Sequence, residues 1–283
     1  MSRSPSLVLG TAQWGDAYGV TNLRGRLSDA DIEDIVRVAK QCSISIVDTA
    51  RGYGDAEDRL RPYARDFSVI SKIRGGGDVV PQIEDSLRRL DVGRLASVLV
   101  HDWEDLDASV RETTASGLAE AREAGLAERV GVSVYTELGV ESAVLALETV
   151  GVPLRALQVP ANALDRRLDD SVLLTQLAND GAEIVVRSAF LQGLLVSEDG
   201  GQSTHPDVAS FFEWVRDEDE EASLLEACLA HVRSLSWATH VVVGVTSGVE
   251  LAEICRSWEV CGEERVPIEF GSSDLELIDP RRW

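Results

Sequence analysis

The segment Ser43-Ile-Ser-Ile-Val-Asp48 is a short apolar run that ends on an acidic residue, and two later runs have the same form. The run Phe67–Ile73 contains Lys72, one of only two lysines in the chain, and the run Leu95–His101 ends on one of its four histidines. Such runs are typical of parallel strands that are buried on both faces. If these strands belong to one barrel, their polar end residues meet at its carboxyl-terminal mouth, where barrel enzymes have their active sites.

Eight such runs alternate with amphipathic segments along the chain. The predicted strands are Leu7–Gly10, Ile44–Asp48, Ser68–Lys72, Ser97–His101, Arg129–Val134, Ala156–Val159, Glu183–Ser188 and His240–Val245. The first predicted helix is Ser28–Gln41, with Ser28 as its N-cap. The other predicted helices are Asp55–Tyr63, Val80–Leu90, Thr114–Ala124, Glu141–Thr149, Ser171–Asp180, Ser223–Ser234 and Val249–Glu259. This alternation predicts an α/β fold, a single (β/α)8 TIM barrel that forms one domain over residues 1–283, in preference to an open doubly wound sheet.

The longest connection follows the seventh strand, from Leu195 to about Glu220. Within it, 198–202 is predicted to be a loop and 211–216 an added helix. The aromatic residues Phe211, Phe212 and Trp214 are explained better by packing of that helix than by a substrate pocket. The other connections look short, which predicts an open mouth and a site that tolerates bulky or sugar-like substrates.

The composition limits the partners that the protein can have. The 283 residues carry a net charge of −22, and the mean hydropathy is −0.04. Nucleic acid and anionic membranes are therefore not expected as partners, because phosphate binding needs concentrated positive charge. No apolar run approaches the roughly 20 residues that span a bilayer, and the first residues are too few for a secretory leader. We expect a cytoplasmic protein that is a monomer or a weak homo-oligomer.

The cysteines lack metal-binding spacing, so no metal site is predicted, and a disulfide is not expected in this compartment. We interpret all four as reduced thiols: Cys42, Cys228, Cys255 and Cys261.

The residue types at the strand ends suit proton transfer to a carbonyl oxygen. Tyr53 follows Asp48 by five residues, and a free phenol with a pKa near 10 is a poor acid at neutral pH. A neighbouring ammonium such as Lys72 lowers that pKa, and a carboxylate such as Asp48 holds the ammonium in place. A histidine beside the phenol can orient the substrate oxygen. Asp48, Tyr53, Lys72 and His101 are thus the predicted catalytic residues.

At these positions the chain closely resembles the aldo-keto reductase superfamily. Asp48-Thr-Ala-Arg-Gly-Tyr-Gly54 is similar to that family's Asp-Thr-Ala-x-x-Tyr-Gly signature. Five further segments resemble the family's other strands in the same order, and these are 9–15, 131–135, 158–162, 187–195 and 244–247. The resemblance implies that Tyr53 is the general acid in reduction and the base in oxidation, and that His101 orients the carbonyl.

The resemblance also implies a nicotinamide cofactor, with NADPH expected and NADH possible, and a small-molecule carbonyl substrate. Ser133 and Gln158 would bind the carboxamide, and the turn after the seventh strand and the last helix would hold the pyrophosphate and adenosine. The other residues implied in cofactor binding are Thr11, Arg187, Ser188, Phe190, Gln192, Gly244, Thr246, Ser247 and Glu250.

Several positions depart from the family pattern. Val134 replaces an asparagine, Ile254 replaces another near the last helix, and Arg187 replaces the aromatic residue that stacks on nicotinamide, although a guanidinium can also stack. Gly244 and Glu250 stand where NADPH-preferring relatives often carry basic residues. Glu250 would repel a 2′-phosphate and could accept hydrogen bonds from a ribose diol.

Two other functional classes remain open from the sequence. The same site could catalyse a redox-neutral epimerisation or elimination on a sugar with nicotinamide that stays bound. The chain could instead be a cofactor-binding regulatory subunit, against which the complete set of Asp48, Tyr53, Lys72 and His101 argues.

Overall fold

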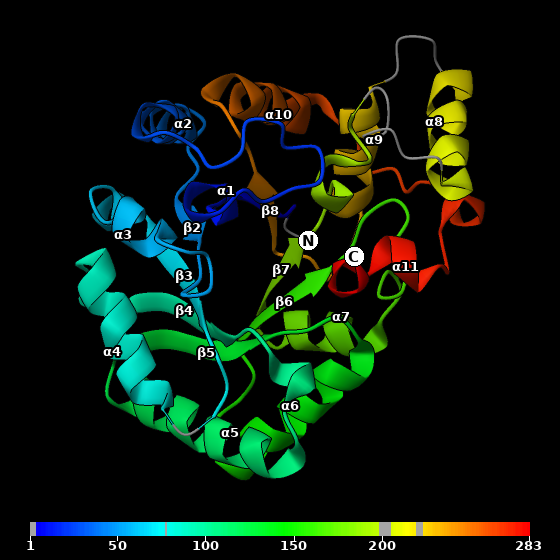
Figure 1. Cartoon of the computed structure of the whole chain (residues 1–283). Helices are drawn as coiled ribbons and strands as arrows, with labels where there is room; N and C mark the ends of the chain where they lie inside the picture. Colours follow the sequence, from blue (N-terminus) through cyan, green and yellow to red (C-terminus); the bar gives the residue numbers. More distant parts are fainter. Residues whose placement is uncertain (1–3, 77, 198–204, 219–222) are drawn as a thin grey trace.

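The structure is a computed structural model that describes residues 4–283 except 77, 198–204 and 219–222. Its strands are all parallel and close into a barrel in chain order, as predicted (Figure 1). They are β1 (Ser6–Gly10), β2 (Ile46–Asp48), β3 (Ser68–Ile73), β4 (Leu95–Val100), β5 (Ala127–Ser133), β6 (Ala156–Pro160), β7 (Glu183–Arg187) and β8 (His240–Gly244). The barrel is closed by β1 and β8, where Leu7 lies opposite Val241.

The helices surround the strands (Figure 1). They are α1 (Ala12–Gly15), α2 (Asp29–Gln41), α3 (Ala56–Leu60), α4 (Val79–Leu90), α5 (Ala108–Glu123), α6 (Glu137–Thr149), α7 (Val172–Asn179), α8 (Pro206–Glu218), α9 (Leu224–Arg233), α10 (Gly248–Val260) and α11 (Leu275–Ile278). Short 3-10 turns are η1 (Ala64–Asp66), η2 (Trp103–Asp105), η3 (Leu191–Gly193), η5 (Ile268–Phe270) and η6 (Pro280–Arg282).

Helix α2 shows how the local sequence forms these elements. Ser28 is its N-cap, as predicted, and forms a capping box in which Ser28 and Asp31 exchange hydrogen bonds. Such a box satisfies backbone N–H groups that the first turn of a helix leaves free. Ile32, Ile35 and Ala39 recur at helical spacing and are buried in the main hydrophobic core between the barrel and its helices. The amphipathic pattern therefore fixes which face of the helix contacts the barrel.

The added helix after β7 is confirmed as α8. Phe211 and Phe212 are buried in a second hydrophobic cluster, and the ring of Trp214 lies 5.4 Å from that of Phe270. None of these three residues lines the central cavity in the described part of the chain. The prediction that they pack the helix is therefore confirmed, whereas the loop predicted at 198–202 lies outside the described residues.

The prediction that the other connections are short is wrong. The connection from β1 to α2 contains α1 and a long loop, and Tyr18 and Arg24 of that loop line the cavity at the mouth. The segment after α10 also folds back over the barrel, so that Pro280 and Arg281 line the same cavity. Irregular segments carry no periodic signal, and their positions depend on contacts with residues far away in the sequence. Tolerance of a bulky or sugar-like substrate therefore stays a prediction.

All four cysteines are free in the structure, as predicted. Across the described ranges, no helix is both long and apolar enough to cross a membrane.

Candidate active site

The four predicted catalytic residues come together at the carboxyl-terminal end of the barrel. Asp48 ends β2, Lys72 is the penultimate residue of β3, and His101 directly follows β4. Lys72 Nζ lies 2.5 Å from Asp48 Oδ2 and donates a hydrogen bond to Tyr53 Oη at 3.2 Å. The His101 ring meets the Tyr53 ring edge-on, with centroids 5.7 Å apart. Lys72 has a side-chain exposure of 0%, and in the described part of the chain it does not line the cavity, so it acts on the cavity through Tyr53.

The loop that carries Tyr53 is held by backbone contacts and by one close approach. Arg51 N donates to Lys72 O at 3.1 Å, and Ala56 N donates to Tyr53 O at 2.9 Å. Gly15, at the end of α1, lies so close that a Cβ atom there would be 1.8 Å from Tyr53 O. Only glycine fits without moving the loop, because real Cβ atoms do not approach that closely. Gly15 is a positioning residue that the sequence analysis did not identify, since its role depends on contact between two separate loops.

The ion pair keeps Lys72 charged inside the protein. Desolvation lowers the pKa of Lys72, but the attraction of Asp48 and the contact with Tyr53 outweigh it, so that the pKa is raised. Desolvation also raises the pKa of Tyr53 above the usual value of a phenol, and the Lys72 charge opposes that rise. The expected lowering by Lys72 is therefore present but smaller than the effect of desolvation. In this state Tyr53 holds its proton firmly.

His101 is a neutral imidazole in this environment. Its backbone N–H donates to Ile73 O at 2.8 Å, which fixes the chain at the end of β4. The side chain is exposed to the cavity but crowded by protein on its other sides. Its pKa is lowered to about 3, first by desolvation and then by the positive charges of Lys72, Arg187 and Arg74. A neutral imidazole can donate one hydrogen bond to a carbonyl oxygen and accept another.

The two residues predicted to bind the carboxamide extend the polar chain from Asp48. Gln158 Nε2 donates to Asp48 Oδ1 at 2.8 Å, and Ser133 Oγ donates to Gln158 Oε1 at 3.4 Å. Both side chains line the cavity while they are buried in the barrel. The hydroxyl of Thr11 donates to Asp48 O at 3.1 Å and therefore supports the backbone of the site.

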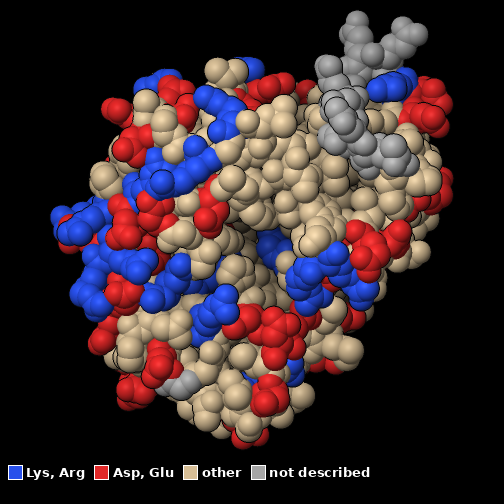
Figure 2. All heavy atoms as spheres, viewed as in Figure 1, with Lys and Arg blue, Asp and Glu red and all other residues tan. Residues whose placement is uncertain are grey.

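A cavity of about 1100 Å³ runs from Tyr53 and His101 to the start of α10. All of the predicted site residues line it except Lys72 and Ser247, as far as the described residues show. Figure 2 shows the hollow near the middle of this face, with Lys or Arg atoms at its floor and charges of both signs around it.

The wall formed by the turn after β7 has an unusual backbone. Ser188, Leu191 and Gln192 have φ values of 61°, 46° and 55°, in the left-handed region that residues with a side chain rarely adopt. Backbone strain of this kind concentrates at ligand-binding sites, where the surrounding structure enforces it. This is the turn that the resemblance assigns to the cofactor, and both Ser188 and Gln192 line the cavity.

The start of α10 is occupied by its own side chains. Glu250 Oε2 accepts hydrogen bonds from Thr246 N at 2.5 Å and from Thr246 Oγ1 at 3.1 Å. Ser247 is the N-cap, and its hydroxyl accepts from Glu250 N at 3.2 Å. Arg24 donates to Thr246 O at 2.9 Å, which places a cation at this end of the cavity. The sequence analysis did not identify Arg24, because it lies 222 residues before Thr246.

These features fit a nicotinamide dinucleotide. The cavity connects the Tyr53 hydroxyl with a helix N-terminus, where backbone N–H groups favour anions. Gly244 leaves room for the Gln13 side chain, whose Nε2 would lie 2.6 Å from a Cβ atom at this point of the wall. Gln13 lines the cavity, and its Oε1 is buried without a hydrogen-bond partner among the described residues. The residues around Ser133 and Gln158 would hold the nicotinamide end, and those around Gln192 and Thr246 the phosphates.

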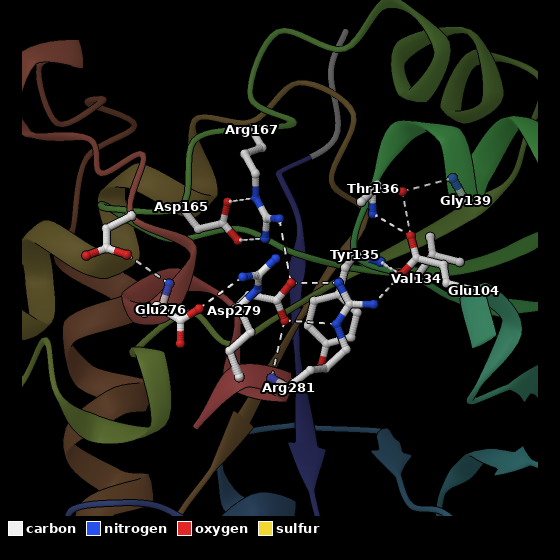
Figure 3. A network of polar contacts seen from close by, with 12 residues as sticks. Glu104, Val134, Tyr135, Thr136, Gly139, Asp165, Arg167, Glu276, Asp279 and Arg281 are labelled. Atoms are coloured by element: carbon white, nitrogen blue, oxygen red, sulfur yellow. Dashed lines mark hydrogen bonds and ion pairs between the residues drawn. The ribbon is translucent and has the colours of Figure 1, made fainter.

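Three residues of the cavity wall form a stack that the sequence analysis did not anticipate. Arg187 Cζ lies 3.9 Å and Arg281 Cζ 3.8 Å from the centre of the Tyr135 ring. Two planar groups cannot both stack at this distance on one face, so the guanidinium groups occupy opposite faces of the ring. Figure 3 shows Arg281 against Tyr135, with ion pairs to Asp279 and Glu104.

The comparison with known proteins identifies the family. The model of the aldo/keto reductase family matches residues 6–263, and the chain belongs to that family. L-glyceraldehyde 3-phosphate reductase of Escherichia coli is 28% identical over 220 residues, which are 69% of this chain and 61% of that protein. The chain thus matches less than two thirds of the length of this relative. Aldo-keto reductase YhdN of Bacillus subtilis is 27% identical over 187 residues, which are 58% of this chain and 53% of that protein.

A solved structure supports the fold. The holo form of the aldo-keto reductase AKR11C1 of Bacillus halodurans has a TM-score of 0.74 at 15% identity and covers 98% of this chain and 95% of its own.

Proposed function

We propose that the protein reduces an aldehyde or ketone to the alcohol, with a reduced nicotinamide dinucleotide as the hydride donor and Tyr53 as the proton donor. The observation that carries this proposal is the contact of Tyr53 Oη with Lys72 Nζ at 3.2 Å, while the same ammonium is paired with Asp48. The word reductase in the names of both relatives supports the direction of the reaction.

The residues of the chain divide the work of proton transfer. His101 donates a hydrogen bond from its neutral imidazole to the substrate oxygen and orients the carbonyl beside Tyr53. When bound, a reduced nicotinamide would supply the hydride for the carbonyl carbon, and Tyr53 Oη would give its proton to the carbonyl oxygen. Lys72 stabilises the phenolate that remains, because a positive charge at this distance favours the deprotonated form. Water then returns a proton to Tyr53. In alcohol oxidation the same groups act in reverse, with Tyr53 as the base.

We propose NADPH as the cofactor, with NADH as the alternative. Arg24 lies at the start of α10, where it donates a hydrogen bond to Thr246 O, and it would attract a phosphate. Glu250 acts in the opposite direction, because its carboxylate takes the Thr246 N–H that a phosphate would use. The side chain of Arg24 is 51% exposed and also pairs with Asp31 at 2.9 Å, so it can reach a ligand at the rim of the cavity.

The first experiment is a titration with NADPH and NADH, followed by the fluorescence of the protein's six tryptophans. Binding of either cofactor supports the site, and the ratio of the two dissociation constants gives the preference. If neither binds, the proposal fails. The second experiment measures the consumption of NADPH with a panel of aldehydes and ketones.

The stoichiometry separates this proposal from the other classes. One NADPH consumed for each alcohol formed supports reduction, whereas conversion of a sugar without net consumption of cofactor indicates a redox-neutral reaction. A regulatory subunit would bind cofactor and a partner protein, and its effect on the partner would survive Tyr53→Phe.

A further inference from the structure

Arg187 ends β7 in the cavity wall and has no carboxylate partner among the described residues. Its Nη2 donates to Val134 O at 3.2 Å, and its guanidinium stacks on Tyr135. A guanidinium has five N–H donors, so most of those of Arg187 have no acceptor in the described protein. A half-buried cation without a partner is unfavourable, and such a group is usually paired with an anion.

The orientation of Arg187 is fixed before any ligand binds. Tyr135 is held from its other side by Arg281, which pairs with Glu104 at 3.0 Å and with Asp279 at 2.6 Å (Figure 3). Glu104 also accepts hydrogen bonds from Tyr135 N at 2.9 Å and Thr136 N at 3.0 Å. The charge of Arg281 is therefore balanced by carboxylates, whereas the charge of Arg187 on the opposite face of the same ring is not balanced by an ion pair among the described residues. A fixed guanidinium loses less conformational entropy when it binds an oxyanion.

The charges around Arg187 do not neutralise it. Asp48 is paired with Lys72, Asp102 Oδ1 accepts from Gly75 N, and Glu250 is bound at the start of α10. The remaining carboxylates of the cavity wall are Asp105 and Glu253, and neither has an ion pair with Arg187 in the described residues.

A second cation lies on the same side of the cavity. Arg74 lines the wall and also has no ion pair within the described ranges. Burial lowers the pKa of His101 most, and the charges of Lys72 and of these two arginines lower it further, so their positive potential acts on the residue that would orient the carbonyl.

We propose that Arg187 binds an oxyanion of the substrate, a carboxylate or a phosphate, so that the enzyme prefers carbonyl compounds that carry such a group over neutral ones of the same shape. The planar fork of a guanidinium matches both oxyanions with two parallel hydrogen bonds. The inference rests on the proposed carbonyl reduction at Tyr53. The competing role for Arg187 is stacking on the nicotinamide ring, which would make it a cofactor residue.

The test uses pairs of substrates that differ only in charge. 4-Formylbenzoate is compared with 4-formylbenzamide, and glyceraldehyde 3-phosphate with glyceraldehyde. For at least one pair, kcat/KM should be at least roughly tenfold higher for the anionic member, which corresponds to about 1.4 kcal/mol of transition-state binding. The pair with the larger ratio identifies the oxyanion as a carboxylate or a phosphate. Ratios near one for both pairs would overturn the inference.

Two matched variants assign the effect to Arg187. Arg187→Met keeps a long side chain without the charge and should remove the preference by lowering kcat/KM of the anionic member. Arg281→Met changes the other arginine on Tyr135 and should reduce the preference less than Arg187→Met does, because the charge of Arg281 is already paired and Glu104 still holds the backbone of Tyr135. If Arg187→Met lowers kcat/KM equally for the anionic and the neutral substrate and weakens NADPH binding, Arg187 belongs to the cofactor site and the inference is wrong.

Direct binding separates this inference from the proposed reaction. Calorimetry with the NADP⁺-loaded protein measures the affinity for the anionic and neutral alcohol products of each pair. Tighter binding of an anionic product that Arg187→Met abolishes supports the oxyanion site even if no carbonyl is reduced, in which case only the proposed reaction fails. Equal binding of both products contradicts the oxyanion site, whatever the activity.

Discussion

Replacement of Asp48 by asparagine tests whether the ion pair in the barrel is buried and charged. The side chains of Lys72 and Asp48 are 0% and 4% exposed, and their charged atoms lie 2.5 Å apart. Asparagine keeps the shape and can still accept a hydrogen bond, so the main loss is the negative charge. An ammonium left buried without its partner costs about 3–5 kcal/mol. Since a loss of about 1 kcal/mol in the free energy of unfolding lowers Tm by roughly 2 °C in a domain of this size, we expect Tm to fall by roughly 6–10 °C.

The assay is urea unfolding at pH 7 for the wild type, Asp48→Asn, Lys72→Met and the double variant. The double variant removes the unpaired charge and should be more stable than Asp48→Asn. The buried charged pair is contradicted if Asp48→Asn lowers the free energy of unfolding by less than about 1 kcal/mol. It is also contradicted if the double variant is no more stable than Asp48→Asn.

The pH dependence of stability gives an independent check on the same pair. In the wild type the pKa of Lys72 is higher in the folded than in the unfolded state. The contribution of Lys72 to the free energy of unfolding is therefore complete below pH 10.5 and is lost as the pH rises through the folded pKa. In Asp48→Asn, desolvation acts without compensation, and the folded pKa of Lys72 should fall below the unfolded value. The variant should therefore gain stability between that lowered pKa and the unfolded one. Parallel pH profiles of the two proteins near pH 10 would contradict this.

Four further outcomes are expected. Tyr53→Phe should lower kcat for carbonyl reduction by at least roughly 10²-fold, as for the loss of a general acid, with little change in the dissociation constant of NADPH; retained activity would exclude Tyr53 as the proton donor. The His101 ring, whose pKa is lowered to about 3, should not titrate near pH 6.5 in NMR spectra. Its contribution to the free energy of unfolding should be complete above pH 6.5 and decline as the pH falls toward 3. A His101 titration near pH 6.5 would show that the site is more hydrated than the structure indicates. Gly15→Ala should lower kcat because its Cβ would displace the Tyr53 loop, whereas Gly93→Ala, with no atom within 4 Å of the added Cβ, serves as the control; equal effects would deny the role of the close approach. Glu250→Ala frees the Thr246 N–H and should strengthen NADPH binding more than NADH binding in the tryptophan titration, and an equal change for both cofactors would place the 2′-phosphate elsewhere.

The loops show where sequence reasoning about this protein was incomplete. The short connections predicted around the mouth are wrong, because the segment that contains Arg281 folds back and is held by Glu104, 177 residues earlier in the chain. Glu250 lines the cavity and also accepts hydrogen bonds from Thr246 at the start of its own helix, a contact that the sequence did not predict. Neither contact follows from periodicity, since both depend on the direction in which a polar side chain turns.

The barrel and the set of residues at its mouth can be predicted from the sequence alone. Short apolar runs alternate with amphipathic segments, and parallel strands place their carboxyl ends on one side, so Asp48, Lys72 and His101 had to converge. The placement of Arg187 and Arg281 on opposite faces of Tyr135 is visible only in the folded protein. Arg281 is paired there with two carboxylates, whereas Arg187 has no ion pair among the described residues. The physical reason is that strand pairing repeats a local pattern, whereas the charge balance of a cavity depends on the partners that distant loops provide.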